Sequence, residues 1–214
     1  MSTNMPVVHV VDDDASFLVA LARLLKASGY AVQTYASATD FLARLGDGAG
    51  CVITDLRMPG MDGLDLQQAL ARGVNMAPVV FLSGAGDIPT TVQAMRQGAE
   101  DFLTKDAPKE AIFAAVDRAI ARDARQRAEN AHRHALRARF DALTSRELEI
   151  LRHVVAGQMN KQIAADLGIN ERTVKLHRTA ITTKLEVHSV AELTRVAQAV
   201  GLLDEPLPTF PKGK

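Results

Sequence analysis

Acidic residues follow two short apolar runs of the chain, at the point where each run ends. Asp12 and Asp13 come directly after the run Val7–Val11, and Asp55 comes after Cys51–Thr54. Short β-branched runs are typical of buried strands, and the carboxyl ends of such strands form the crevice where open α/β sheets bind ligands. A single acid at a strand end indicates little, because many such acids only cap the next turn. Two acidic clusters placed alike indicate one shared site.

The first half of the chain alternates between apolar runs and helical patterns. We expect strands at 7–11, 30–35, 51–54, 78–82 and 101–104, helices at 15–28, 37–45, 64–72 and 88–97, and a fifth helix from near Pro108. Such alternation predicts an α/β fold with a five-stranded, doubly wound parallel sheet. In the strand order of a flavodoxin-like sheet the first and third strands are neighbours, so Asp12, Asp13 and Asp55 would converge.

The predicted cluster has the chemistry of a metal site. Three close carboxylates repel one another unless a cation neutralises them, and ligation by oxygen alone suits Mg²⁺. The chain lacks a Gly-x-x-x-x-Gly-Lys loop for nucleotide phosphates. Two further strand ends supply the hydroxyl of Ser83 and the ammonium of Lys105. Together these groups are the parts needed for phosphoryl transfer to an aspartate.

These residues lie in segments that resemble the receiver domain of two-component response regulators. The segments are Val11-Asp12-Asp13, Asp55–Gly63, Leu82-Ser83-Gly84 and Asp101–Lys105, and the resemblance covers about residues 5–122. The resemblance implies that Asp55 is phosphorylated by a sensor histidine kinase. It also implies a Mg²⁺ site made by Asp12, Asp13, Asp55 and the backbone carbonyl of Arg57, a switch pair of Ser83 and Phe102, and a phosphoryl contact from Lys105.

The residue after Lys105 departs from the family pattern. Receiver domains usually have a proline there, often after a cis peptide bond, whereas this chain has Asp106. A cis bond before another residue costs roughly 3–4 kcal/mol. Either the bond is trans and Lys105 moves, or the strain is held. Because Asp106 adds negative charge near the phosphoryl group, we expect an altered rate or lifetime of phosphorylation. The alternative is a degenerate receiver that is never phosphorylated.

Charge divides the chain into two parts. Residues 1–121 contain 14 acidic and 9 basic residues, whereas residues 122–214 contain 11 acidic and 16 basic ones. The acidic part suits a cation and the basic part suits a polyanion. The opposite charges also suggest that the two parts dock in the unphosphorylated protein. One cysteine excludes a disulfide framework, and we expect a cytoplasmic protein without a signal peptide or membrane partner.

A long helix is predicted between the two parts. No Gly or Pro interrupts the chain from Lys109 to about Arg139, and large apolar residues become rare after Ile120. We expect this helix to begin as part of the first domain and to end as a solvated linker, with a coiled-coil seam as the alternative. The expected divisions are a receiver at 1–122, a linker at 123–142, a DNA-binding domain at 143–203 and a flexible tail at 204–214.

The second domain shows only helical patterns. Thr144 to Glu147 resembles a capping box that opens a helix to about Ala156, and further helices are expected at 161–167, 171–185 and 189–200. A short helix, a turn containing glycine and a second helix form a helix-turn-helix. The fold class of this part is therefore an all-α, four-helix, helix-turn-helix domain.

The helix 171–185 has one apolar face and one face that could contact DNA. Val174 and Ile181 mark the core face, whereas Lys175, Arg178 and Thr179 could reach base edges. The expected DNA-binding residues are Lys161, Arg172, Thr173, Lys175, His177, Arg178, Thr179 and Lys184, of which Lys161, Arg172 and Lys184 would neutralise phosphates. A merely solvated face is the alternative for the basic residues, and His177 could equally pack internally.

The motifs of this second domain resemble the LuxR-type helix-turn-helix, and the whole chain resembles a NarL/FixJ-type response regulator. The resemblance implies a transcription regulator that binds double-stranded promoter DNA, forms a homodimer when phosphorylated and is not an enzyme beyond hydrolysing its own aspartyl phosphate. One alternative is a phosphoryl sink or protein-interaction module with a silent DNA-binding domain. Another is a phosphatase-like enzyme with Asp55 as nucleophile, although Arg57 stands where that enzyme would need a second acid.

Overall fold

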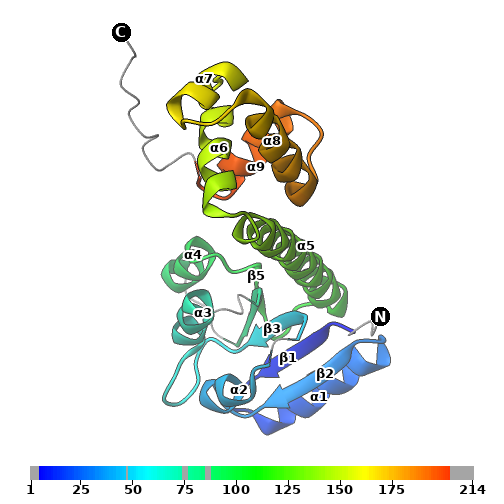
Figure 1. Ribbon diagram of the computed structural model, residues 1–214. Coiled ribbons are helices and arrows are strands. Elements are labelled where there is room, and N and C mark those ends of the chain that lie inside the picture. The colour runs from blue at the N-terminus through cyan, green and yellow to red at the C-terminus, as the bar shows by residue number, and fades with distance from the viewer. Residues whose placement is uncertain (1–4, 47, 74–76, 85–87, 203–214) are drawn as a thin grey trace. The chain divides into compact units, whose positions relative to one another are not determined.

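The computed structural model describes residues 5–46, 48–73, 77–84 and 88–202 (Figure 1). The predicted tail at 204–214 lies outside these residues. The chain divides into two compact units, Met1–Arg127 and Ala128–Lys214. Among the described residues, no helix combines the length and the apolar character that a membrane span requires.

The first unit alternates strands and helices as predicted. Its elements are β1 (Val7–Val11), α1 (Ala15–Ala27), β2 (Ala31–Tyr35), α2 (Ala38–Arg44), β3 (Gly50–Thr54), α3 (Gly63–Arg72), β4 (Val79–Ser83), α4 (Ile88–Arg96), β5 (Asp101–Thr104) and the first part of α5 (Lys109–Asp141). The strands pair in parallel in the order β2-β1-β3-β4-β5. This order confirms the predicted doubly wound sheet and places the carboxyl ends of β1 and β3 side by side.

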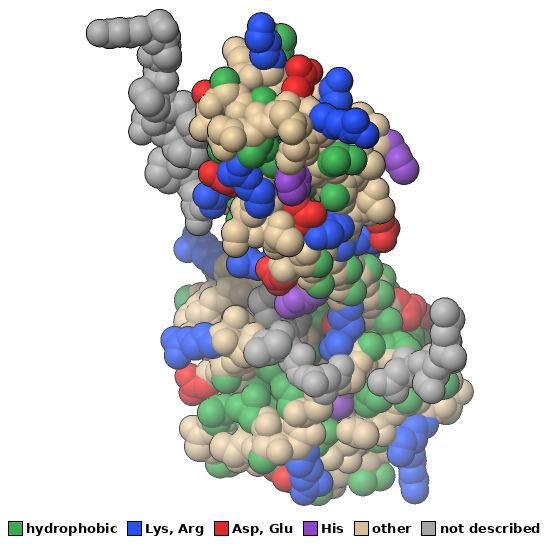
Figure 2. All heavy atoms as spheres, in the orientation of Figure 1, with side chains coloured by type: hydrophobic (Ala, Val, Ile, Leu, Met, Phe, Trp, Pro, Cys, Tyr) green, Lys and Arg blue, Asp and Glu red, His purple; other side chains and the backbone are tan. Residues whose placement is uncertain are grey.

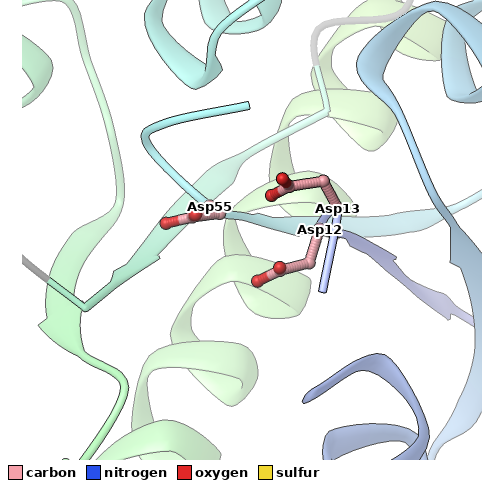
Figure 3. A group of neighbouring side chains, drawn as sticks. All are labelled: Asp12, Asp13 and Asp55. Atoms are coloured by element: carbon pink, nitrogen blue, oxygen red, sulfur yellow. The ribbon is translucent and has the colours of Figure 1, made fainter. Parts of the chain in front are cut away.

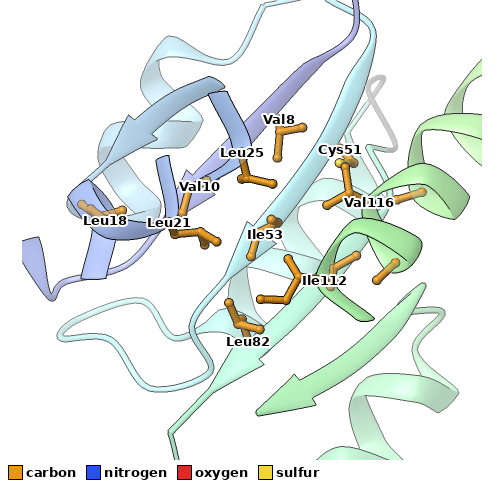
Figure 4. Packing of buried hydrophobic residues seen from close by; sticks show 13 residues of the cluster. Val8, Val10, Leu18, Leu21, Leu25, Cys51, Ile53, Leu82, Ile112 and Val116 are labelled. Carbon is orange, nitrogen blue, oxygen red and sulfur yellow. The ribbon is translucent and has the colours of Figure 1, made fainter. Parts of the chain in front are cut away.

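Helices cover both faces of this sheet because its strands are apolar on both sides. Val8, Val10 and Ile53 pack against α1 and α5 on one face, as Figure 4 shows. Val11 and Val52 face α2, α3 and α4 on the other. Strands buried on both faces are typical of parallel sheets. The core therefore fixes the strand ends on which the acidic residues stand.

Local capping starts the helices where the sequence predicts them. Ser37 caps α2 by accepting a hydrogen bond from the Asp40 amide at 3.1 Å. Asp14 caps α1 by accepting bonds from the Ser16 and Phe17 amides. Asp14 thus serves the helix, which leaves Asp12 and Asp13 as the acids of the β1 end.

The second unit is helical. It contains the end of α5, then α6 (Ser145–Val155), α7 (Asn160–Asp166), α8 (Glu171–Leu185) and α9 (Val190–Ala199). The predicted capping box is present, because Thr144 and Glu147 bond each other's backbone amides. Asn170 caps α8 through the Thr173 amide at 2.8 Å. Val174 and Ile181 of α8 are buried in the core, as predicted.

The prediction of a solvated linker over 123–142 is wrong at both of its ends. Asp123 is buried and accepts a hydrogen bond from the Gly50 amide at 2.9 Å, which ties α5 to the start of β3. Leu136 and Phe140 are buried in the core of the second unit. The sequence does not reveal these buried residues, because isolated apolar side chains in an alanine-rich helix do not form a recognisable apolar stripe. His132 and His134, which precede Leu136 on α5, are exposed.

Candidate functional site

The structure brings Asp12, Asp13 and Asp55 together at the carboxyl ends of β1 and β3. Val11 and Thr54, the residues before Asp12 and Asp55, pair in the sheet, and one oxygen from each of the three carboxylates lies within 4.8 Å of the others. Figure 3 shows these three side chains close to one another where the two strands end. Asp12 and Asp55 are buried, whereas Asp13 is exposed. This set of oxygens is consistent with binding of a divalent metal ion.

Backbone amides hold one oxygen of each buried carboxylate. Asp12 Oδ1 accepts a hydrogen bond from the Asp14 amide at 2.9 Å, and Asp55 Oδ1 accepts one from the Leu56 amide at 2.7 Å. The hydroxyl of Thr54 donates to the carbonyl of Asp55 at 3.0 Å. These bonds fix both side chains, so Oδ2 of each carboxylate is the oxygen presented to the crevice.

Lys105 reaches these oxygens from the end of β5. Its Nζ lies 2.6 Å from Asp12 Oδ2 and 3.5 Å from Asp55 Oδ2. It also lies 4.5 Å from the centre of the Phe17 ring, within the range of a cation–π contact. All peptide bonds of the described residues are trans, including the one between Lys105 and Asp106. The trans bond therefore leaves Lys105 within reach of both acids.

Burial and charge act in opposite directions on this ion pair. Burial raises the pKa of Asp12, and the hydrogen bond from Lys105 offsets only part of that rise. Burial alone would lower the pKa of Lys105, but its hydrogen bond with Asp12 and its attraction to both carboxylates raise it overall. The ammonium is therefore held in its charged form beside the acids.

The remaining predicted residues of this unit lie on β4, on β5 and in the turn after β3. Ser83 ends β4 and is buried. Phe102 is half-buried on β5, and its ring stacks on that of Phe81, its partner on β4, with 5.7 Å between the ring centres. Arg57 is exposed in the turn after Asp55. The structure thus brings Asp12, Asp13, Asp55 and Lys105 together, and it places Ser83 and Phe102 on the neighbouring strands β4 and β5.

Gly63 is a further site residue whose role the sequence reasoning missed. A Cβ atom at this position would lie 2.3 Å from the carbonyl oxygen of Asp55 and 2.9 Å from the Phe81 ring. Only glycine therefore lets the start of α3 lie against the turn that follows Asp55. In the sequence, the pair Asp62-Gly63 is typical of a turn but does not reveal this close approach.

In the second unit, α7, a turn and α8 form the predicted helix-turn-helix. Lys161, Arg172, Lys175 and Thr179 are exposed, whereas Thr173, His177 and Arg178 are half-buried. On the face seen in Figure 2, Lys and Arg side chains lie among acidic and hydrophobic ones. On that face, charge is not segregated into a uniform basic surface.

Lys184 differs from the other predicted phosphate contacts because it has an internal partner. Its Nζ lies 2.6 Å from Glu147 Oε2 and donates to the Ala142 carbonyl at 3.2 Å. Glu147 is buried, and the hydrogen bond from Lys184 lowers its pKa. The pair joins the end of α8 to the start of α6. The structure therefore gives Lys184 a stabilising role that the sequence did not reveal.

His153 is a second buried polar residue that sequence reasoning missed. It lies on α6, its Nδ1 is in a short hydrogen bond with Gln158 Oε1, and Asp166 Oδ2 lies 3.9 Å away. These contacts join α6 to the turn before α7 and to the end of α7. A histidine on an amphipathic helix gives no sequence signal that separates this role from a solvated one.

Comparison with known proteins agrees with this arrangement. Residues 8–117 match the family described as response regulator receiver domain, and residues 141–197 match bacterial regulatory proteins of the luxR family. The transcriptional regulatory protein FixJ of Azorhizobium caulinodans is 43% identical over 98% of this chain and 100% of its own length. The response regulator protein TmoT of Ectopseudomonas mendocina is 42% identical over 92% of this chain and 90% of its own length. Among solved structures, the response regulator StyR is 40% identical, with a TM-score of 0.82 over 91% of this chain and 98% of its own.

Proposed function

Because the chain belongs to the two-component response regulators that join a receiver domain to a LuxR-type DNA-binding domain, we propose that Mg²⁺-dependent phosphorylation of Asp55 controls its binding to DNA. The chain is a transcription regulator. Regulators of this type are generally not enzymes. Their receiver domain implies a kinase partner, and their second domain implies DNA as the target.

Asp55 Oδ2 is the proposed nucleophile. Oδ1 is engaged by the Leu56 amide, whereas Oδ2 faces the crevice beside Lys105. This oxygen would attack the phosphorus of a phosphohistidine in the kinase, forming an O–P bond while the N–P bond breaks and the imidazole leaves. The products are an aspartyl phosphate and a free histidine. Lys105 and Ser83 would then contact the phosphoryl oxygens.

The acidic cluster is the proposed Mg²⁺ site. Asp12, Asp13, Asp55 and the carbonyl of Arg57 would hold the ion, which supplies positive charge for the phosphoryl oxygens. Hard oxygen donors and the partial exposure of Asp13 fit an ion that keeps several of its waters. Lys105 balances the same negative charge, so both cations favour an anionic phosphoryl group at this position.

Ser83 and Phe102 would transmit the change. They stand on neighbouring strands, β4 and β5, and a phosphoryl group that draws the Ser83 hydroxyl toward it alters the packing beside the Phe81 and Phe102 rings. If the receiver can adopt two packing arrangements, the added charge of a phosphoryl group is sufficient to shift the equilibrium between them. We propose that the resulting arrangement favours a homodimer, which binds two half-sites about one helical turn of DNA, or a multiple, apart.

The proposed DNA contacts follow the helix-turn-helix. Lys175, Arg178 and Thr179 would reach base edges from α8, while Lys161 and Arg172 would contact phosphates. Thr173 and His177 complete the proposed surface. Lys184 contributes through its ion pair with Glu147 and less through phosphates.

The observation that carries the proposal is the convergence of the Asp12 and Asp13 carboxylates and the Lys105 ammonium on the carboxylate of Asp55. The test is footprinting of genomic DNA with and without acetyl phosphate, comparing wild type, Asp55→Asn and Asp65→Asn. Asp65 is an exposed acid on α3 and serves as the control. We expect the phosphodonor to strengthen footprints of the wild type and the control but not of Asp55→Asn. Equal footprints for all three in every condition would refute control through Asp55, and their absence would indicate a phosphoryl sink.

A further inference from the structure

A side-chain hydrogen bond joins the two helices of the helix-turn-helix. Asn160, the first residue of α7, accepts this bond at Oδ1 from Nη1 of Arg178 on α8, at 2.8 Å. Both side chains are half-buried. The partners are 18 positions apart in the sequence, so the bond forms only when the turn between the helices is folded.

Helix capping does not account for Asn160. Asparagine favours the cap position before a helix and is a poor helix former inside one. In α7 the cap position is instead occupied by Met159, which is 67% exposed, and its amide is satisfied by the Gln162 side chain at 2.8 Å. Asn160 stands one position too late to cap. Its side-chain oxygen is used for Arg178.

The partner of Arg178 is neutral, unlike the partners of two lysines on the same helix. Lys175 lies 3.8 Å from Glu171, and Lys184 lies 2.6 Å from Glu147, so a carboxylate offsets the charge of each. The Asn160 amide restricts the guanidinium without offsetting its charge. A guanidinium has five N–H donors, and the bond to Asn160 uses one of them. The others stay available to a DNA base.

We propose that Asn160 is a positioning residue that holds Arg178 in place to read one base pair, with guanine as the base. This inference rests on the proposed function, in which Arg178 faces base edges. A guanidinium that is already held loses less side-chain freedom on binding, and paired hydrogen bonds to O6 and N7 of guanine are the commonest specific contact of arginine. Asn160 thereby sets how strongly that base pair is distinguished.

The test is selection of binding sites from a random double-stranded DNA library by the full-length protein with acetyl phosphate. Arg178→Ala should relax the preference for guanine at one base pair of each half-site. Asn160→Ala should relax the same pair by about fivefold to tenfold, which corresponds to roughly 1–1.4 kcal/mol, and should leave other pairs unchanged. The double variant should lose no more than Arg178→Ala alone, because coupled residues are not additive. The salt dependence of binding should stay at its wild-type slope in Asn160→Ala, since no phosphate contact is lost.

Two further variants distinguish positioning from folding. Asn160→Asp keeps the acceptor oxygen and adds a negative charge, so it should keep the preference for guanine and weaken binding to all sequences. Gln198→Ala changes an exposed side chain on α9 and should leave the selected sites unchanged. The proposal would be overturned if Asn160→Ala reduced the preference equally at every base pair of the site. It would also be overturned if Asn160→Ala changed a base pair other than the one that Arg178→Ala changes. Failure of the proposed function looks different, because the wild type itself would then select no sequence or would select the same sites equally well with and without acetyl phosphate.

Discussion

Replacing Lys105 by methionine should tighten Mg²⁺ binding while it impairs phosphorylation. Lys105 Nζ lies 2.6 Å from Asp12 Oδ2, and a Mg²⁺ ion bound to that oxygen would lie about 2.1 Å from it. The two cations would then be at most about 4.7 Å apart. Even with the dielectric constant of water, charges of +2 and +1 at that distance repel by about 1.8 kcal/mol. Lys105 therefore opposes Mg²⁺ binding, either by repelling the bound ion or because it must first leave Asp12. Removing the ammonium should remove this cost.

The expected change is an increase in Mg²⁺ affinity of about tenfold or more, measured by isothermal titration calorimetry. The dielectric constant of water gives a lower bound on this repulsion, because the Lys105 side chain is only 21% exposed. The rate of phosphorylation by acetyl phosphate should fall in the same variant, since a phosphoryl contact is lost. Lys105→Arg keeps the charge, and Lys109→Met removes an exposed lysine. Both controls should bind Mg²⁺ as the wild type does. A weaker affinity in Lys105→Met would refute competition between the cations.

Three further changes test other parts of the structure. Glu147→Gln should lower the free energy of unfolding by about 1 kcal/mol, because it removes the carboxylate that accepts a hydrogen bond from a lysine on α8. Since the pKa of Glu147 is lowered in the folded protein, this contribution to stability should be present above about pH 4.3 and be lost as the pH falls further. Denaturant titrations at several pH values would measure both effects. Gly63→Ala should destabilise the protein by about 1–3 kcal/mol and slow phosphorylation by acetyl phosphate, because its Cβ would lie 2.3 Å from the carbonyl oxygen of Asp55. Asp106→Asn should raise the rate of phosphorylation by acetyl phosphate by about twofold to fivefold at low salt, because it removes an exposed negative charge that repels this anionic donor.

Each of these changes has a matched control. Glu149→Gln breaks an exposed pair with Arg146 and should cost less than about 0.5 kcal/mol. Gly46→Ala adds a methyl group where no atom lies within 4 Å, so stability should be retained. Glu110→Gln removes another exposed acid and should leave the phosphorylation rate unchanged. Equal effects of a variant and its control would contradict the reason given for that variant.

The strands and helix starts of this chain were predictable because their signals are local. A β-branched run such as Cys51–Thr54 has few alternatives to a buried strand, and Ser37, Thr144 and Asn170 cap the helices that follow them. The strand order then brings Asp12 and Asp55 together without any knowledge of side-chain contacts. A site made of residues at strand ends can therefore be predicted from a sequence once the strand order of the sheet is assumed.

Contacts between residues distant in the sequence were not predictable in this way. Glu147 and Lys184 are 37 positions apart, and each alone looks like a solvated charge. The cation–π contact of Lys105 with Phe17 depends on how the loop after β5 reaches the first turn of α1, which no spacing reveals. The cost of a side chain at Gly63 likewise depends on the approach of α3 to another loop. These features need the packed structure.

The burial of Leu136 and Phe140 limits where this regulator can be joined to another. The family match of the DNA-binding part begins at residue 141, but both side chains belong to the core of that part. A chimera that fuses a foreign receiver at residue 141 would leave two apolar side chains out of the core, a loss of roughly 1.5–3 kcal/mol each. Exchange of receivers between such genes would therefore succeed at junctions that precede Leu136, within the long helix rather than at its end.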